Sequence, residues 1–227
     1  MDSAEIDGVL EAAERSVFAG SGLSGTRFWG AVALVKADRP LVDRYADRIA
    51  AIDQEALQRW AMLTVPLGLG TTLMSIATLA GLALVGWTYA LDGLPAVAVF
   101  AVGLGALLVT THGLAHLVVG RLAGIRFTTW FVGPLSVPLT GGVKIDYGTY
   151  LRAAAKRRAW MHASGAIVTK LVPFALVGAA IAADLPAWAV WGVIALGVAN
   201  VVLDLVWSTK RSDWKRFRRE MTFARSA

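Results

Sequence analysis

Four long apolar segments dominate this sequence and limit what it can fold into. They cover Ala61–Trp87, Leu94–Gly120, Ala159–Ala183 and Leu185–Trp207. A helix needs about 20 apolar residues to cross the hydrocarbon core of a bilayer, and each segment reaches that length. Only 17% of the residues are charged, whereas soluble domains carry about a quarter. The sequence therefore predicts an all-α polytopic membrane protein with four transmembrane helices.

Lysine and arginine are distributed unevenly among the connections. The connections at 88–93 and 183–186 contain neither residue, whereas the middle connection and the C-terminal tail contain many. Short loops rich in these residues stay in the cytoplasm, so both termini and the middle connection are predicted to be cytoplasmic. The residues are Arg121, Arg126, Lys144, Arg152, Lys156, Arg157 and Arg158 in the middle connection, and Lys210, Arg211, Lys215, Arg216, Arg218 and Arg219 in the tail.

The net charge of +6 comes from this basic inner rim and tail. Basic residues next to membrane spans attract anionic lipid headgroups. We therefore expect anionic lipid as a partner at the inner rim, and we expect no nucleic acid.

The segments before and after the spans differ from them in composition. Residues 1–60 are mixed in charge and are expected to form a cytoplasmic region of one or two helices, broken at Gly20–Gly25 and at Pro40. After Pro40, apolar residues recur every three or four positions up to Trp60, which is typical of an amphipathic helix. Residues 61–209 are expected to form the four-span core, and residues 210–227 a basic cytoplasmic tail.

The connection between spans two and three loses helical periodicity. Extended segments at Arg126–Val132, Leu135–Leu139 and Val143–Tyr147 are separated by glycine and proline residues. This pattern predicts a small extended or β-hairpin loop on the cytoplasmic side. Its edge would suit an extended peptide that adds as a further strand, and a plain lid or connector is the alternative.

Few ionisable or strongly polar side chains lie inside the predicted spans. Such residues are costly in lipid and usually functional. His112 and His116 are four residues apart, so a helix places both rings on one face, as in motifs that present two nitrogens to zinc. The full set is His112, His116, His162, Lys170, Asn200 and Asp204.

Depth along the spans suggests which of these side chains meet. At 1.5 Å per helical residue, both histidines of the pair, His162 and Asp204 lie about 6 to 13 Å from the nearest basic residue at the inner end. Imidazoles and a carboxylate suit zinc, with iron or manganese as alternatives and a metal-free polar network as another. Asp204 is favoured as the acidic ligand over Asp213, although Asp204 would also suit Lys170 or Lys210 as an ion-pair partner. Asn200 and Lys170 are candidates for orienting a substrate.

The order of these motifs resembles the site-2 protease family of intramembrane zinc metalloproteases, from about Leu94 to Trp214. The segment THGLAHLVVGRLAGIRF is similar to the HExxH helix of that family. MHASGAIVTK stands where the family has an Ala-Gly-Pro motif followed by Asn. ANVVLDLVWSTKRSDW stands where the family has Asn-Leu-x-Pro and then the Asp-Gly motif that supplies the third zinc ligand.

The chain departs from this family at the residue that matters most for peptide cleavage. Gly113 occupies the position of the glutamate that would act as general base, a role worth about 10²- to 10⁴-fold in rate. Ala166 stands in place of the proline, no proline follows Asn200, and Trp214 follows Asp213 in place of glycine.

The resemblance and its departures together imply a degenerate member with no catalytic residue. We expect a pseudoprotease that keeps a zinc-type site and binds transmembrane clients or extended peptides. One alternative is an active intramembrane zinc metalloprotease in which Asp204 or a substrate group acts as the base. Others are a metal-dependent membrane oxidase or hydroxylase, and a structural helix bundle.

Overall fold

The computed structural model describes residues 2–134, 141–206 and 212–226. Helices account for 79% of the described residues, and the chain divides into two compact units. We call them the α/β unit, formed by Met1–Leu67, Gly120–Arg158 and Glu220–Ala227, and the span unit, formed by Gly68–Val119 and Ala159–Arg219.

Three helices begin the α/β unit: α1 (Ser3–Phe18), α2 (Phe28–Ala37) and α3 (Arg39–Trp60). The Asp2 side chain caps α1 by accepting a hydrogen bond from the Glu5 backbone nitrogen. The amphipathic helix predicted after Pro40 is α3, and its apolar face packs on α1 and α2. The predicted break at Gly20–Gly25 separates α1 from α2, and the region forms three helices where the sequence predicted one or two.

The extended loop is a small antiparallel sheet of three strands in the order β1-β2-β3. Its strands are β1 (Leu63–Pro66), β2 (Phe127–Val132) and β3 (Gly141–Ile145). The predicted extended or hairpin loop is confirmed as β2 and β3, although its Leu135–Leu139 segment lies outside the described residues. The sequence assigned β1 to the first span, because a short apolar run does not distinguish a strand from the start of a helix.

A short helix, α6 (Tyr147–Arg152), follows the sheet. The Asp146 carboxylate caps α6 by accepting from the Thr149 backbone nitrogen at 2.8 Å.

The four-span fold class is confirmed. Candidate spans cover Leu67–Ala90, Gly93–Leu122, Ala155–Ala182 and Ala187–Asp204. They lie on α4 (Leu67–Trp87) with the short η1 (Thr88–Ala90), α5 (Gly93–Leu122), α7 (Ala155–Ala182) and α8 (Ala187–Val206), and α9 (Asp213–Ser226) follows them. The predicted end of span four, Trp207, lies outside the described residues.

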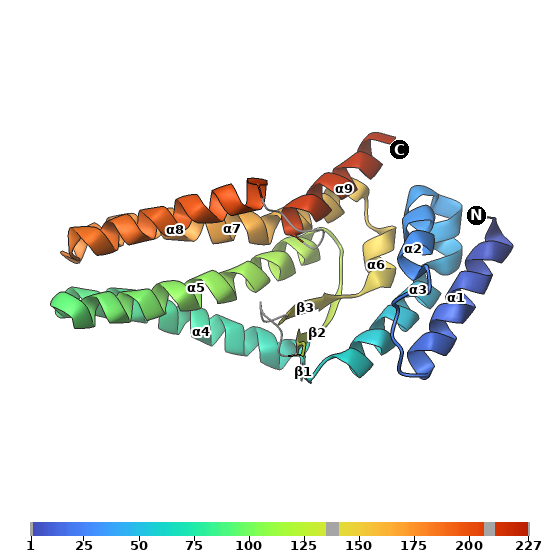
Figure 1. Ribbon diagram of the computed structural model, residues 1–227, viewed down its shortest axis with the longest axis horizontal. Helices are drawn as coiled ribbons and strands as arrows, with labels where there is room; N and C mark the ends of the chain where they lie inside the picture. The colour runs from blue at the N-terminus through green and yellow to red at the C-terminus, as the bar shows by residue number, and fades with distance from the viewer. Residues whose placement is uncertain (1, 135–140, 207–211, 227) are drawn as a thin grey trace. The chain divides into compact units, whose positions relative to one another are not determined.

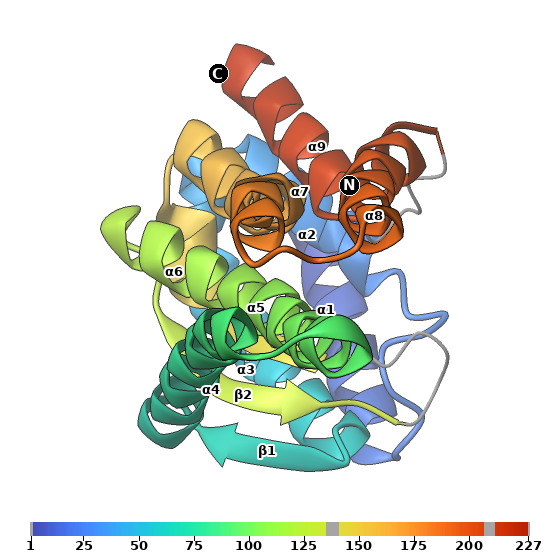
Figure 2. The same ribbon diagram turned by 90° about the vertical axis from the view of Figure 1, so that its left-hand side faces the viewer.

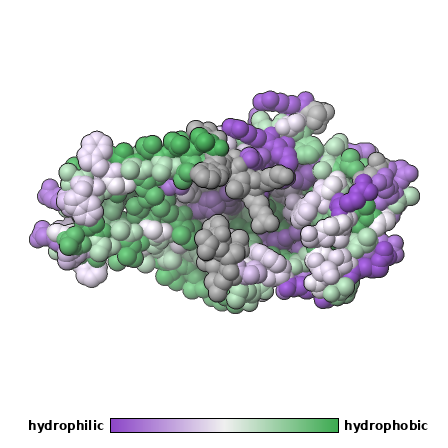
Figure 3. Space-filling model, in the orientation of Figure 1, coloured by the Kyte–Doolittle hydropathy of each residue, from purple (hydrophilic) through white to green (hydrophobic). Residues whose placement is uncertain are grey.

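The long helices lie alongside one another in the span unit, with both tight turns at the same end (Figures 1 and 2). On the face seen in Figure 3, hydrophobic residues make up most of the surface along these helices, and many large apolar side chains of the spans are exposed. This exposure of apolar residues is what helices surrounded by lipid require.

Small residues bring α4 and α5 into close contact. A Cβ added at Gly103 would lie 2.9 Å from the Gly81 carbonyl oxygen, so only glycine allows this approach. The Thr78 and Thr110 hydroxyls are 2.8 Å apart across the same pair of helices. These contacts give α5, which carries the histidine pair, a rigid support.

Candidate metal centre

Three side chains of the span unit bring potential metal ligands together. His112 and His116 lie one turn apart on α5, with ring centroids 4.7 Å apart. Asp213 is the first residue of α9, and its Oδ2 lies 3.3 Å from His112 Nε2 and 3.1 Å from His116 Nε2. The three ligand atoms lie within 4.8 Å of one another.

The start of α9 explains why Asp213 is held in place. The Ser212 hydroxyl accepts a hydrogen bond from the Lys215 backbone nitrogen at 3.3 Å, which caps the helix. A carboxylate in the first turn is also stabilised by the partial positive charge at the helix N-terminus.

Hydrogen bonds on the far side of each ring determine where its proton sits. His116 Nδ1 lies 2.7 Å from the Met161 carbonyl oxygen, which can only accept, so this nitrogen carries a hydrogen. The Thr169 hydroxyl donates to the Gly165 carbonyl oxygen and therefore accepts from His112 Nδ1, at 2.8 Å. Both neutral rings are therefore assigned as Nδ1–H forms, each with a lone pair on Nε2.

The two Nε2 lone pairs and the Asp213 carboxylate converge on one point. Burial raises the pKa of Asp213, but when the two rings carry a hydrogen on Nε2, their hydrogen bonds and positive charge outweigh that effect and hold the pKa well below its usual range. The carboxylate is therefore ionised. Lone pairs and an anion repel one another at this separation unless a positive charge lies among them. A metal ion or additional protons on the rings would supply that charge.

The two distances from the histidine nitrogens to the Asp213 carboxylate are compatible with a shared metal ion. Two ligand atoms at about 2.0–2.1 Å from a tetrahedral zinc ion stand about 3.3 Å apart, close to the spacings at Asp213. Two imidazoles and one carboxylate form a donor set that zinc accepts, and three protein ligands leave a fourth position open. Met161 and Thr169 would orient the two histidines from behind, as hydrogen-bond acceptors commonly do in zinc sites.

Gly165 makes room for this arrangement. A Cβ at this position of α7 would overlap the imidazole ring of His116. Sequence reasoning missed Gly165, Met161 and Thr169. Their available signal was the four-residue spacing of Met161, Gly165 and Thr169, which places all three on one face of a helix.

Asp204 forms an ion pair with Lys170 and does not belong to the group of His112, His116 and Asp213. Asp204 Oδ2 accepts from Lys170 Nζ at 2.5 Å, and Lys170 also donates to the Ala166 carbonyl oxygen. Asp213, rather than the Asp204 favoured by depth, therefore joins the histidines. The flexible lysine side chain explains the difference, because it reaches a carboxylate at another depth. The alternative partner, Lys210, lies outside the described residues.

The other two predicted site residues lie outside this three-residue group. His162 is buried, with 4% of its surface exposed. Asn200 donates to the Leu196 carbonyl oxygen of its own helix at 3.2 Å.

An apolar cavity of about 290 Å³ lies between α7, α8 and the start of α9. The Lys170–Asp204 ion pair and Trp214 line it, together with Ala166, Ile167, Leu171 and Val201. Among the described residues nothing accepts a hydrogen bond from the buried Trp214 Nε1.

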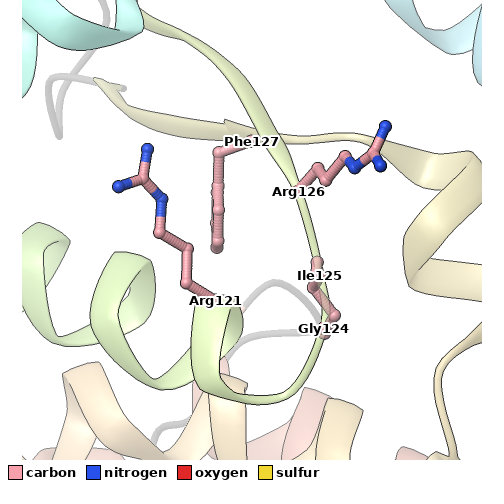
Figure 4. A pocket seen from close by; sticks show the side chains of 5 residues that line it. All are labelled: Arg121, Gly124, Ile125, Arg126 and Phe127. Carbon is pink, nitrogen blue, oxygen red and sulfur yellow. The ribbon is translucent and has the colours of Figure 1, made fainter.

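A second cavity of about 350 Å³ follows the end of α5, within the α/β unit (Figure 4). Arg121 and Phe127 lie side by side in it, whereas Arg126 points away. The predicted basic rim therefore presents a single guanidinium group here, not a pair that would clamp an anion.

Gly113 is buried on α5, between the two histidines in sequence. In the described part of the chain, Asp213 is the one carboxylate in the candidate group. No family model, no curated protein and no solved structure matches this chain.

Proposed function

We propose that this protein is a site-2-protease-like membrane protein that holds zinc between His112, His116 and Asp213 and binds client polypeptides without cutting them. The convergence of two Nε2 lone pairs on the Asp213 carboxylate carries the proposal. The resemblance of the surrounding motifs to that protease family supports it.

The three residues of the group would each supply one ligand to the metal. His112 and His116 act as neutral ligands, and Asp213 supplies a negative charge that offsets part of the metal charge. Bound zinc would supply Lewis acidity toward a peptide carbonyl. Gly113 has no side chain that could take or return a proton, so the rate contribution of a general base is missing.

Two features support the binding of a polypeptide. The apolar cavity beside Lys170 and Trp214 suits an apolar client side chain. In the described sheet, β1 and β3 are the outer strands, so each has an edge that an extended peptide could pair with.

Metal content of the detergent-purified protein tests the ligand set. We expect about one equivalent of zinc in the wild type and a loss of most of it in His116→Ala and in Asp213→Asn. Asp204→Asn is the matched control and should retain the metal, because Asp204 pairs with Lys170. Less than about a tenth of an equivalent in the wild type would contradict the metal proposal.

Introducing a glutamate at position 113 tests whether the lack of a general base prevents peptide cleavage. The wild type should crosslink to a transmembrane substrate without cutting it, whereas Gly113→Glu should gain cleavage of the same substrate. The double variant Gly113→Glu/His116→Ala should be inactive. Wild-type cleavage that His116→Ala abolishes would overturn the non-enzymatic proposal and favour an active protease.

A further inference from the structure

A cavity of about 210 Å³ in the α/β unit has a cationic lining. It lies between α2, α3, the end of α6 and the start of α7. Among the described residues, three cationic side chains and no carboxylate line it, and apolar side chains make up the rest of its wall. The lining side chains that matter are Lys36, Arg39, Arg158, Val42, Leu151 and Phe223.

Two of these cations share one buried carboxylate. Glu220 is fully buried, and its two oxygens lie 2.6 Å from Lys36 Nζ and 2.6 Å from Arg158 Nε. Burial raises the pKa of Glu220, but the two cations outweigh it and lower the pKa to about 2. At neutral pH this group therefore contributes two positive charges and one negative charge.

The Arg158 guanidinium has one nitrogen, Nη2, that can still donate to a ligand. Its Nε donates to Glu220, and its Nη1 donates to the carbonyl oxygens of Leu151 and Ala153. Within the residues that the structure describes, Nη2 has no acceptor, and it is not sealed from solvent. Only 3% of this residue is exposed, so its guanidinium is held rigidly at the cavity wall.

Arg39 adds a third positive charge at the mouth of the cavity. Its side chain is 64% exposed, and its Nη1 donates to the Arg152 carbonyl oxygen. The neighbouring carboxylate, Asp43, lies 3.5 Å from Arg39 Nε and is also exposed. An exposed, solvated ion pair of this kind is weak, so Arg39 remains available to an anion.

We propose that this cavity binds a phosphomonoester through Lys36, Arg39 and Arg158. Guanidinium and ammonium groups are the usual partners of phosphate oxygens, and a planar guanidinium can offer two parallel donors. Arg158 stands near the beginning of the candidate span Ala155–Ala182, after Lys156 and Arg157. Residues at such a position meet lipid headgroups, so a phosphatidic acid headgroup is the expected source, and a soluble phosphomonoester is the other. This inference does not depend on the metal centre.

Titration of the full chain tests the site with two probes. Glycerol 3-phosphate is added to protein in a neutral detergent at constant ionic strength, and the unfolding temperature is followed. Phosphatidic acid is compared with phosphatidylcholine by native mass spectrometry of lipid adducts. We expect a saturable response to at least one phosphomonoester, and Arg39→Gln should weaken it about tenfold by removing a charge-assisted contact.

Matched variants on the same helix distinguish a site from general charge. Arg44→Gln removes a similarly exposed arginine of α3 and should leave the response unchanged, whereas Asp43→Asn should strengthen it. A response to phosphatidic acid alone assigns the lipid as the source, and a response to glycerol 3-phosphate assigns the soluble ester. No saturable response to either probe, or equal responses of Arg39→Gln and Arg44→Gln, would overturn the proposal.

Discussion

At the residue scale, Thr169 decides how His112 presents its nitrogen. Its hydroxyl accepts from Nδ1 and so leaves the Nε2 lone pair facing Asp213. Thr169→Val keeps the shape of the side chain and removes that acceptor. Loss of such an orienting partner typically lowers metal affinity about 10- to 100-fold, which a titration against a competing chelator measures.

Thr111→Val is the control for this change. Thr111 lies next to His112 on α5, but its hydroxyl donates only to the Leu107 carbonyl oxygen of its own helix. Equal metal affinity of the two variants would show that the Thr169 hydroxyl does not orient His112.

Gly165 sets how closely α7 approaches the histidine pair. The methyl group of Gly165→Ala would overlap the His116 ring, so we expect a loss of about 1–3 kcal/mol of stability and reduced zinc content. Gly178→Ala lies in the same helix with nothing within 4 Å of the added carbon, so helix propensity should make it neutral or stabilising by up to about 1 kcal/mol. Thermal unfolding and elemental analysis of both variants check this, and similar losses in both would contradict it.

Sequence reasoning found His112 and His116 because their spacing and their presence in an apolar segment are local properties. It ranked Asp204 above Asp213 because it used depth along the membrane normal. Depth is one coordinate of three, and it does not report which faces of two helices meet. The Lys170–Asp204 ion pair and the position of α9 are products of helix packing.

At the element scale, Glu220 joins helices of the α/β unit. It accepts from Lys36 on α2, Tyr150 on α6 and Arg158 on α7. Its pKa is lowered from 4.5 to about 2. Its contribution to the free energy of unfolding is therefore complete above pH 4.5 and is lost as the pH falls toward 2. This shift corresponds to about 3 kcal/mol at neutral pH.

Glu220→Gln should therefore destabilise the protein by about 3–5 kcal/mol at pH 7, because two buried cations lose their counter-charge. The difference from the wild type should shrink between pH 4.5 and 2, as measured by denaturant unfolding in detergent. Glu55→Gln, which removes an exposed i,i+4 partner of Arg59, should change stability by less than about 1 kcal/mol. If the difference in unfolding free energy between Glu220→Gln and the wild type did not change with pH, the ionised Glu220 carboxylate would not be the source of this stability.

β1 shows why one element escaped sequence reasoning. Leu63–Pro66 is four residues long and continues into an apolar helix, so local periodicity does not separate it from the span. Its conformation depends on β2, with Leu63 opposite Val132 and Val65 opposite Trp130. The partner strand lies more than sixty residues away in sequence.

At the scale of the whole molecule, an even number of candidate spans predicts that both termini lie on one side of the membrane. The chain has no cysteine, so single introduced cysteines report topology without background. We expect an impermeant maleimide to label Asp92→Cys, in the turn between spans one and two, in intact cells. Ser21→Cys and Arg157→Cys should react only after permeabilisation, because basic connections stay in the cytoplasm. Labelling of Ser21→Cys in intact cells would reverse the predicted orientation.

The sequence by itself determined the number of spans, the amphipathic α3, the extended loop and the histidine pair. Each follows from hydrophobicity or spacing within one segment, and solvation by lipid or water acts on segments one at a time. The tertiary structure alone decided the third strand, the choice of Asp213, the proton positions on both rings and the carboxylate shared at Glu220. These depend on contacts between residues far apart in the chain, where packing and charge pairing select one partner among several that the sequence allows.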